Sequence, residues 1–133
     1  MIDSRAIAGS IVALARSKAA DLVLCGVQST EDLFGQLVPY AGALLGWPHV
    51  SGSSHVGIEA SALRVTQERG GGIAATYEIA LPAVIGVQTA SKAPRYVSGS
   101  KLREASKTAI GKAPSEPAGF ERSAEIVALR LPG

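Results

Sequence analysis

The sequence is poor in the residues that most often build metal centres and cross-links. It has one cysteine and two histidines, and aromatic residues make up only 5% of it. A single cysteine, Cys25, excludes an intrachain disulfide and a cysteine metal cluster. His49 and His55 have neither a partnering cysteine nor the spacing of two ligands on one helix face, so we expect no metal site.

Charge and long hydrophobic runs are also scarce. Charged residues make up 18% of the chain and the net charge is +2, which is too small to predict a nucleic-acid or membrane surface. No apolar run is long enough to form a transmembrane segment. Residues 1–21 carry several charges and resemble an amphipathic helix, not a secretory signal. We therefore expect a protein of the reducing cytoplasm.

What is present suits one α/β domain over residues 1–133. A helix is predicted from Asp3 or Ser4 to about Lys18. Residues 22–25 then form a continuous apolar run, which is typical of a parallel strand covered on both faces. A helix that leads into such a strand is half of a βαβ unit, so the sequence resembles a doubly wound domain without its front part. The expected inward face of the helix is formed by Ile7, Ile11, Leu14 and Ala15.

The middle of the chain has the pattern of antiparallel strands. Residues 63–69 and 73–80 alternate between apolar and polar side chains on either side of three glycines at 70–72, which predicts a β-hairpin. Residues 83–87 predict another apolar strand. In the polar segment 49–58, the candidate inward residues are Val50, Val56 and Ile58. The tail is predicted as a basic loop or linker over residues 90–123 with a short helix at 101–108, followed by a last strand at 124–131.

A polar loop follows the first apolar strand and precedes an Ala/Leu-rich helix predicted from Pro39 to Gly46. Ligands of open α/β sheets bind at the carboxyl ends of strands, where this loop would lie. Gly35 would let a ligand approach the backbone closely. Asp32 could accept a hydrogen bond from a ribose hydroxyl or cap the helix, and Gln36 could offer its amide to a phosphate or base. Spacing alone favours a nucleotide site and a merely capped helix about equally.

No catalytic constellation is visible elsewhere. The three glycines at 70–72 lack the strand–loop–helix context and the following Lys-Ser/Thr of a phosphate loop, so a hairpin turn is the better interpretation. No Ser/His/Asp arrangement can be proposed, and Glu31 and Asp32 are neighbours that face apart. A hydrolytic enzyme is therefore disfavoured, and a stand-alone nucleotide-dependent enzyme ranks last among the function classes.

Residues 21–48, DLVLCGVQSTEDLFGQLVPYAGALLGWP, resemble the beta subunit of electron transfer flavoproteins. In that family a DLVL.G.Q strand and loop lead into a D..(T/N)GQ.GP segment and a helix ending LG.P. The match continues through the glycine hairpin, through LPAVIGV at 81–87 and APRYVS at 93–98. The resemblance spans nearly the whole chain, and it implies a partial doubly wound, adenine nucleotide alpha hydrolase-like parallel sheet with an added antiparallel β-hairpin.

The resemblance implies an electron carrier and not an enzyme with its own substrate. It implies FAD shared with an alpha subunit, AMP or a second FAD held by the beta subunit, and flavin dehydrogenases as electron donors. The implied docking segment for these dehydrogenases carries Arg95, Tyr96, Gly99 and Lys101. The implied adenine-nucleotide contacts are Asp32, Gly35 and Gln36, with backbone help around Cys25, Gly26 and Gln28.

The sequence also departs from the family pattern. It resembles a beta subunit without its N-terminal half and without its C-terminal arm. Leu37 replaces the hydroxyl residue that usually follows Gly-Gln, Val27 replaces a frequent lysine, and Gly99 replaces the docking leucine. The alternative hypothesis is therefore a non-redox interaction or scaffold module that has lost nucleotide binding. An opened sheet edge also predicts a homo-oligomer or marginal stability for the isolated chain.

Overall fold

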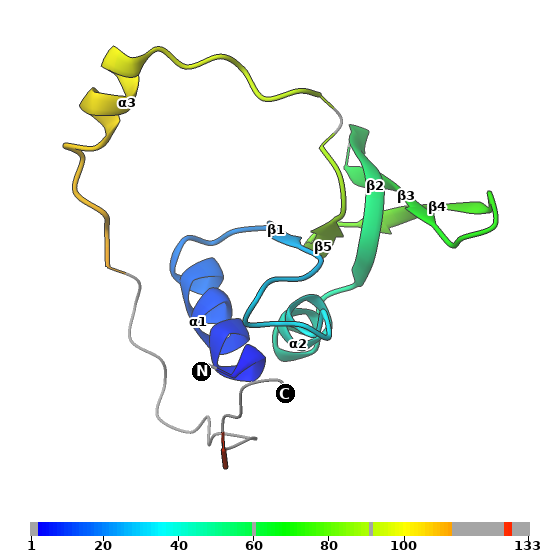
Figure 1. Ribbon diagram of the computed structural model, residues 1–133. Coiled ribbons are helices and arrows are strands. Elements are labelled where there is room, and N and C mark those ends of the chain that lie inside the picture. The colour runs from blue at the N-terminus through cyan, green and yellow to red at the C-terminus, as the bar shows by residue number, and fades with distance from the viewer. Residues whose placement is uncertain (1–2, 60, 91, 113–126, 129–133) are drawn as a thin grey trace.

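The computed structural model describes residues 3–59, 61–90, 92–112 and 127–128 (Figure 1). Within them, the chain forms three helices and five strands in the order α1, β1, α2, β2, β3, β4, β5, α3. Their bounds are α1 Ser4–Ser17, β1 Leu22–Gly26, α2 Leu37–Leu45, β2 His49–Glu59, β3 Ala62–Glu68, β4 Ala74–Ala80, β5 Ala83–Val87 and α3 Gly99–Ala105.

The first helix begins where the sequence predicts, but it buries a different face. Asp3 is the N-cap residue, and its carboxylate accepts a hydrogen bond from the backbone N–H of Arg5. The buried residues are Ala8, Gly9, Val12 and Ala15. Of the expected inward residues, only Ala15 is buried; Ile7 and Ile11 are partly exposed, and Leu14 is 40% exposed. Ala8 clusters with Val38 and Ala41 of α2, so the face of α1 that carries small side chains is turned toward α2.

The five strands form one mixed sheet in the order β1-β5-β2-β3-β4. Strand β5 pairs in parallel with both β1 and β2, whereas β2, β3 and β4 pair antiparallel. Strand β1 is as predicted, and α2 begins two residues earlier than expected and ends at Gly46 in the left-handed conformation (φ 69°). The connection from β1 through α2 to β2 crosses over β5, which is the arrangement of an α/β unit.

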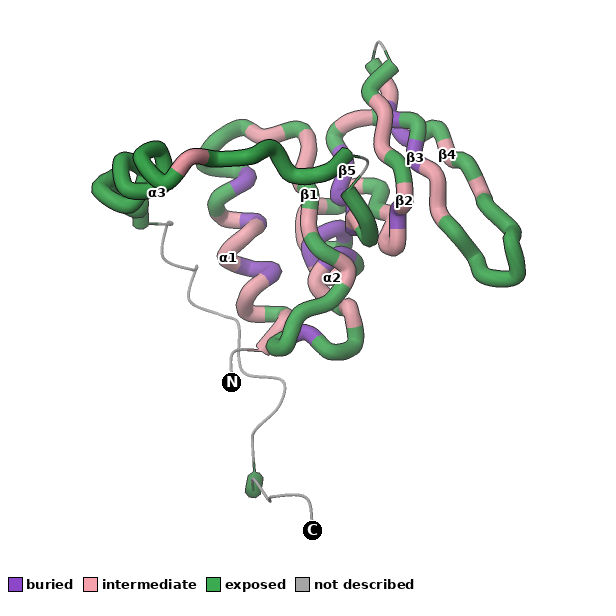
Figure 2. The backbone as a smooth tube through the Cα atoms, turned by 45° about the horizontal axis from the view of Figure 1, so that its top comes forward, coloured by how far each residue is buried: buried purple, intermediate pink, exposed green. Residues whose placement is uncertain are grey.

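The core lies on both faces of β5 (Figure 2). On one face, Val84 packs with Ala8 of α1 and with Val38 and Ala41 of α2. On the other face, Ile85 clusters with the inward residues of the hairpin, which are Leu63, Val65 and Ile79. The alternation predicted for the hairpin is confirmed, because Leu63, Val65 and Ile79 are buried and Ala75 and Tyr77 are partly buried, whereas Ile73 at the turn is 66% exposed.

Two details of the sheet differ from expectation. Ile58 is 71% exposed, because β2 extends past the part of the sheet that the core covers, whereas Val50 and Val56 pack against the core as expected. Leu24 of β1 is 57% exposed, whereas Leu22 on the same face packs against the core cluster that contains Ile85. Within the described residues, this face of β1 is therefore covered only in part. The structure confirms a mixed α/β architecture with an antiparallel hairpin. Helices α1 and α2 lie on the same face of the sheet. A doubly wound fold has helices on both faces, and that arrangement is not seen among the described residues.

After β5 the chain leaves the body as an exposed arm that carries α3 (Figures 1 and 2). The helix at 99–105 lies close to the predicted 101–108, and none of its residues is buried. The predicted last strand, 124–131, and the second part of the predicted basic linker fall almost wholly outside the described residues.

Candidate functional site

The loop from Val27 to Gln36 connects the carboxyl end of β1 to the N-terminus of α2, and its organising residue is Asp32. Although it lies in a polar loop, Asp32 is only 4% exposed. One carboxylate oxygen, Oδ1, accepts hydrogen bonds from the backbone N–H of Gln36 at 2.9 Å and from the Ser4 hydroxyl at 2.9 Å. The other, Oδ2, accepts from the N–H of Leu37 at 2.8 Å. Asp32 therefore caps α2 and joins the loop to α1.

This capping changes the chemistry of the α2 N-terminus. Free N–H groups at a helix N-terminus attract anions, but the N–H groups of Gln36 and Leu37 already bind the Asp32 carboxylate. An added phosphate at this place would meet a negative charge. Of the two roles that the sequence left open for Asp32, the structure shows the cap; direct contact with a nucleotide stays a prediction.

The rest of the loop is held by short-range hydrogen bonds. The Ser29 hydroxyl accepts from the N–H groups of Glu31 and Asp32, and the Gln28 amide donates to the Leu33 carbonyl at 2.8 Å. Hydrogen bonds from the Thr30 side chain, the Ser29 side chain and the backbone lower the pKa of the exposed Glu31 carboxyl. The loop thus presents an anionic group to solvent and contains no basic residue.

Gly35 is required by the loop itself. Its φ is +63°, and a Cβ at this position would lie 2.8 Å from the Val27 carbonyl oxygen, so any other residue would be both strained and crowded. The next residue, Gln36, has an exposed side chain that makes no capping hydrogen bond. Among the predicted contact residues, Gln36 therefore offers its amide to a ligand most freely.

The two remaining predicted contact residues lie at the end of β1. The Cys25 side chain packs toward the helices with Val38 and Ala41, and burial raises the pKa of its thiol. Only its backbone is therefore available to a ligand in the loop. Gly26 is exposed, and a Cβ there would have the Gln28 carbonyl oxygen as its nearest neighbour at 4.0 Å, which leaves open space at the carboxyl end of the strand.

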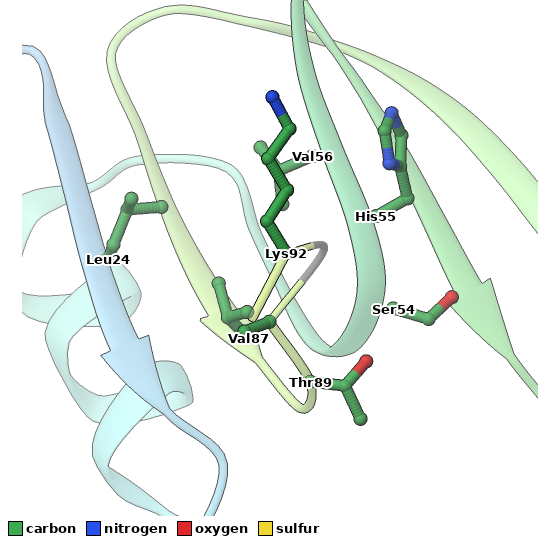
Figure 3. A pocket seen from close by; sticks show the side chains of 8 residues that line it. Leu24, Ser54, His55, Val56, Val87, Thr89 and Lys92 are labelled. Carbon is green, nitrogen blue, oxygen red and sulfur yellow. The ribbon is translucent and has the colours of Figure 1, made fainter. Parts of the chain in front are cut away.

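The sequence did not point to a cleft of about 300 Å³ on the sheet face opposite α1 and α2. Figure 3 shows its lining side chains on β1, on β2 and on the chain leaving β5. The lining surface is mainly apolar, and Ser54, His55, Thr89 and Lys92 contribute polar groups to it. The cleft contains none of the six predicted nucleotide contacts; its lining is Leu24, Ser54, His55, Val56, Val87, Thr89, Ala90 and Lys92. The exposure of Leu24, which appears only once β1 is placed at the sheet edge, is the signal that sequence reasoning lacked.

The predicted partner-docking residues lie together on the exposed arm, far along the chain from the loop. Tyr96 is 93% exposed, and Arg95, Gly99 and Lys101 are exposed as well. Gly99 is the first residue of α3, and a Cβ there would meet nothing within 4 Å. The structure thus gives these residues no role within the body of the protein, and their docking role stays a prediction.

Comparison with known protein families shows which family the chain belongs to. Residues 2–117 match the family described as the electron transfer flavoprotein domain. The chain belongs to the electron transfer flavoprotein family. Curated members that it resembles include a probable electron transfer flavoprotein subunit beta of Schizosaccharomyces pombe, which is 31% identical over 89% of this chain and 46% of the relative.

Two further members of the electron transfer flavoprotein family align over most of the chain. The subunit beta of Bradyrhizobium diazoefficiens is 26% identical over 97% of this chain and 51% of the relative. That of Mus musculus is 27% identical over 94% of this chain and 49% of the relative. The chain therefore spans about half the length of the curated relatives it matches. Among the described residues, no helix is long and apolar enough to cross a membrane.

Proposed function

We propose that this chain acts as part of an electron transfer flavoprotein, as the beta-type component that holds an adenine nucleotide and assembles with an alpha subunit and its FAD. The observation that carries the proposal is the family match over residues 2–117, together with a hydrogen-bonded loop at the carboxyl end of a parallel strand. The flavin would carry the electrons, and the protein would position it.

The hydrogen bonds of the loop indicate which residues would position it and which would contact a nucleotide. Asp32 is buried and fully hydrogen-bonded to Ser4, Gln36 and Leu37, so its role is to position the loop. The groups left for contact are the backbone around Gly26 and the exposed amide of Gln36. Because the loop has carboxylates and no cation, neutral hydrogen-bond donors would hold the phosphate, and the isolated chain should bind AMP weakly.

The nucleotide site can be tested by titrating AMP into the purified chain by isothermal calorimetry. Gln36→Ala removes one exposed amide, and the loss of one hydrogen bond worth about 1 kcal/mol predicts roughly fivefold weaker binding. Thr76→Ala is the control, because Thr76 is exposed and lies on β4, at the edge of the sheet farthest from β1. Equal affinity of the two variants and the parent chain would contradict the assignment of the loop.

The docking surface for electron donors is the second part of the proposal. Its support is the resemblance of residues 93–98 to the family's docking segment and the exposure of Arg95, Tyr96, Gly99 and Lys101 on the arm. The alternative function, an interaction module without nucleotide, is favoured by one observation: the Asp32 carboxylate occupies the N–H groups of α2 that an anion would use.

A further inference from the structure

The loop that follows β1 carries an exposed aromatic residue, Phe34. Its side chain is 86% exposed, and that of the neighbouring Leu33 is 67% exposed. Single apolar residues are common on protein surfaces, so exposure alone assigns no role to the ring. The reason to consider a role is the place of Phe34 in the fold and the chemistry of the loop around it.

The backbone on both sides of Phe34 is held by hydrogen bonds. The carbonyl of Leu33 accepts from the Gln28 amide at 2.8 Å. The N–H of Gly35 donates to the Asp32 carbonyl at 3.2 Å. The loop therefore specifies where the Phe34 side chain leaves the backbone, and little further ordering of this segment would be needed when a ligand binds.

Phe34 lies close in sequence to the groups that are free to contact a nucleotide. It stands two residues before Gln36, whose side chain is exposed and makes no capping hydrogen bond. The loop begins after Gly26, where β1 ends, and α/β sheets bind their ligands at the carboxyl ends of strands. An aromatic ring at such a place can stack on the flat face of a base, which contributes roughly 5- to 150-fold in affinity per base.

The same loop offers little to a phosphate. Residues 27–36 contain no Lys, Arg or His. The Asp32 carboxylate binds the N–H groups of Gln36 and Leu37, and the exposed Glu31 adds a second carboxylate. A phosphate at this place would meet like charges, whereas an uncharged base would not. The base is therefore the part of a nucleotide that this loop suits better.

We propose that Phe34 stacks on the base of the bound nucleotide, and that this contact contributes more to affinity than any contact with the phosphate. The inference rests on the proposed nucleotide site and adds which part of the ligand the chain recognises. Adenosine, which lacks the phosphate, then binds at least as tightly as AMP. Ribose 5-phosphate, which lacks the base, binds far more weakly than either.

The test titrates the purified 133-residue chain with AMP, adenosine and ribose 5-phosphate by isothermal calorimetry. Phe34→Ala removes the ring, Phe34→Leu keeps apolar bulk without an aromatic face, and Phe34→Trp restores an aromatic face. Leu33→Ala is the matched control, because it removes the adjacent exposed side chain and keeps the carbonyl that accepts from Gln28. Circular dichroism of each variant checks that it is folded.

Arg5→Ala tests a cation outside the loop as the source of affinity. Arg5 is exposed and follows Ser4, whose hydroxyl donates to Asp32. The proposal predicts unchanged binding of AMP and adenosine in Arg5→Ala. Weaker binding of AMP with unchanged binding of adenosine would show that the phosphate dominates, and it would overturn the proposal.

We expect Phe34→Ala and Phe34→Leu to weaken the binding of AMP and adenosine alike, by about fivefold or more. Phe34→Trp and Leu33→Ala should keep the parent affinity. Equal losses in Leu33→Ala and Phe34→Ala, or ribose 5-phosphate binding as tightly as AMP, would overturn the inference.

Failure of this inference can be told apart from failure of the proposed nucleotide site. A parent chain that binds AMP, with unchanged affinity in Phe34→Ala, would overturn the role of the ring and leave the site standing. If that variant then lost assembly with an alpha subunit, the ring would be assigned to a protein contact instead. A parent chain that binds neither AMP nor adenosine would overturn both proposals.

Discussion

Strands β1 and β5 are the same length, pair with each other in parallel and are both apolar, yet they have different environments. Strand β5 is buried along Ala83–Gly86 and has a neighbour on each edge. Within the described residues, strand β1 has one neighbouring strand, and Leu24 projects from a face that is only partly covered. An apolar run thus predicts a parallel strand correctly, but the number of its neighbours decides how much of it is buried. Among the described strands, β5 is therefore the most deeply buried, and β1 is the less covered of the two.

The largest expected effect is the difference in unfolding free energy lost when a side chain of β5 or of β1 is truncated. Ile85 is fully buried in β5, so Ile85→Ala should lower the free energy of unfolding by about 3 kcal/mol through lost burial and a cavity. Leu24→Ala should lower it by about 1 kcal/mol or less, because more than half of that side chain is already in water. Urea unfolding of both variants measures the two values. Equal losses would mean that β1 is covered in solution.

A smaller effect is expected from adding a methyl group to a glycine of each strand. A Cβ at Gly86 would lie 2.9 Å from Cγ2 of Val38 and 3.0 Å from Oγ of Ser51, so Gly86→Ala should cost about 2 kcal/mol by overpacking. Gly26→Ala, at the end of β1, has open space and should leave the unfolding midpoint nearly unchanged. If Gly86→Ala is neutral as well, α2 does not pack on β5 as closely as described.

The parts of the fold that could be predicted from the sequence are those specified by local patterns. The hairpin follows from period-two alternation on either side of the glycines at 70–72, the start of α1 follows from Asp3, and the end of α2 follows from Gly46. The buried face of α1 could not be predicted in this way. Hydrophobicity favours Ile7, Ile11 and Leu14, but the structure turns Ala8 toward Val38 and Ala41 of α2, and that choice depends on a partner helix.

The candidate site shows the same limit. The sequence identifies the loop, because polar residues and Gly35 follow a buried strand. It could not choose between two roles of Asp32, since the hydrogen bonds from the N–H groups of Gln36 and Leu37 to the carboxylate depend on the fold of the whole loop, in which Gly35 has a φ of +63°. The hydrogen bond from the Ser4 hydroxyl to Asp32 joins residues far apart in sequence, so no local sequence pattern predicts it. The cleft beside Leu24 depends on the order of the strands in the sheet and could not be predicted from the sequence either.

The central claim is that this chain works as the beta-type component of an electron transfer flavoprotein. The most direct test is native mass spectrometry of the chain co-expressed with an electron transfer flavoprotein alpha subunit, with flavin content read from the absorbance spectrum. The account predicts an assembly that contains both polypeptides and one FAD, with AMP retained in the parent chain and reduced in Gln36→Ala. A chain that stays apart from the alpha subunit and holds neither flavin nor nucleotide would contradict it.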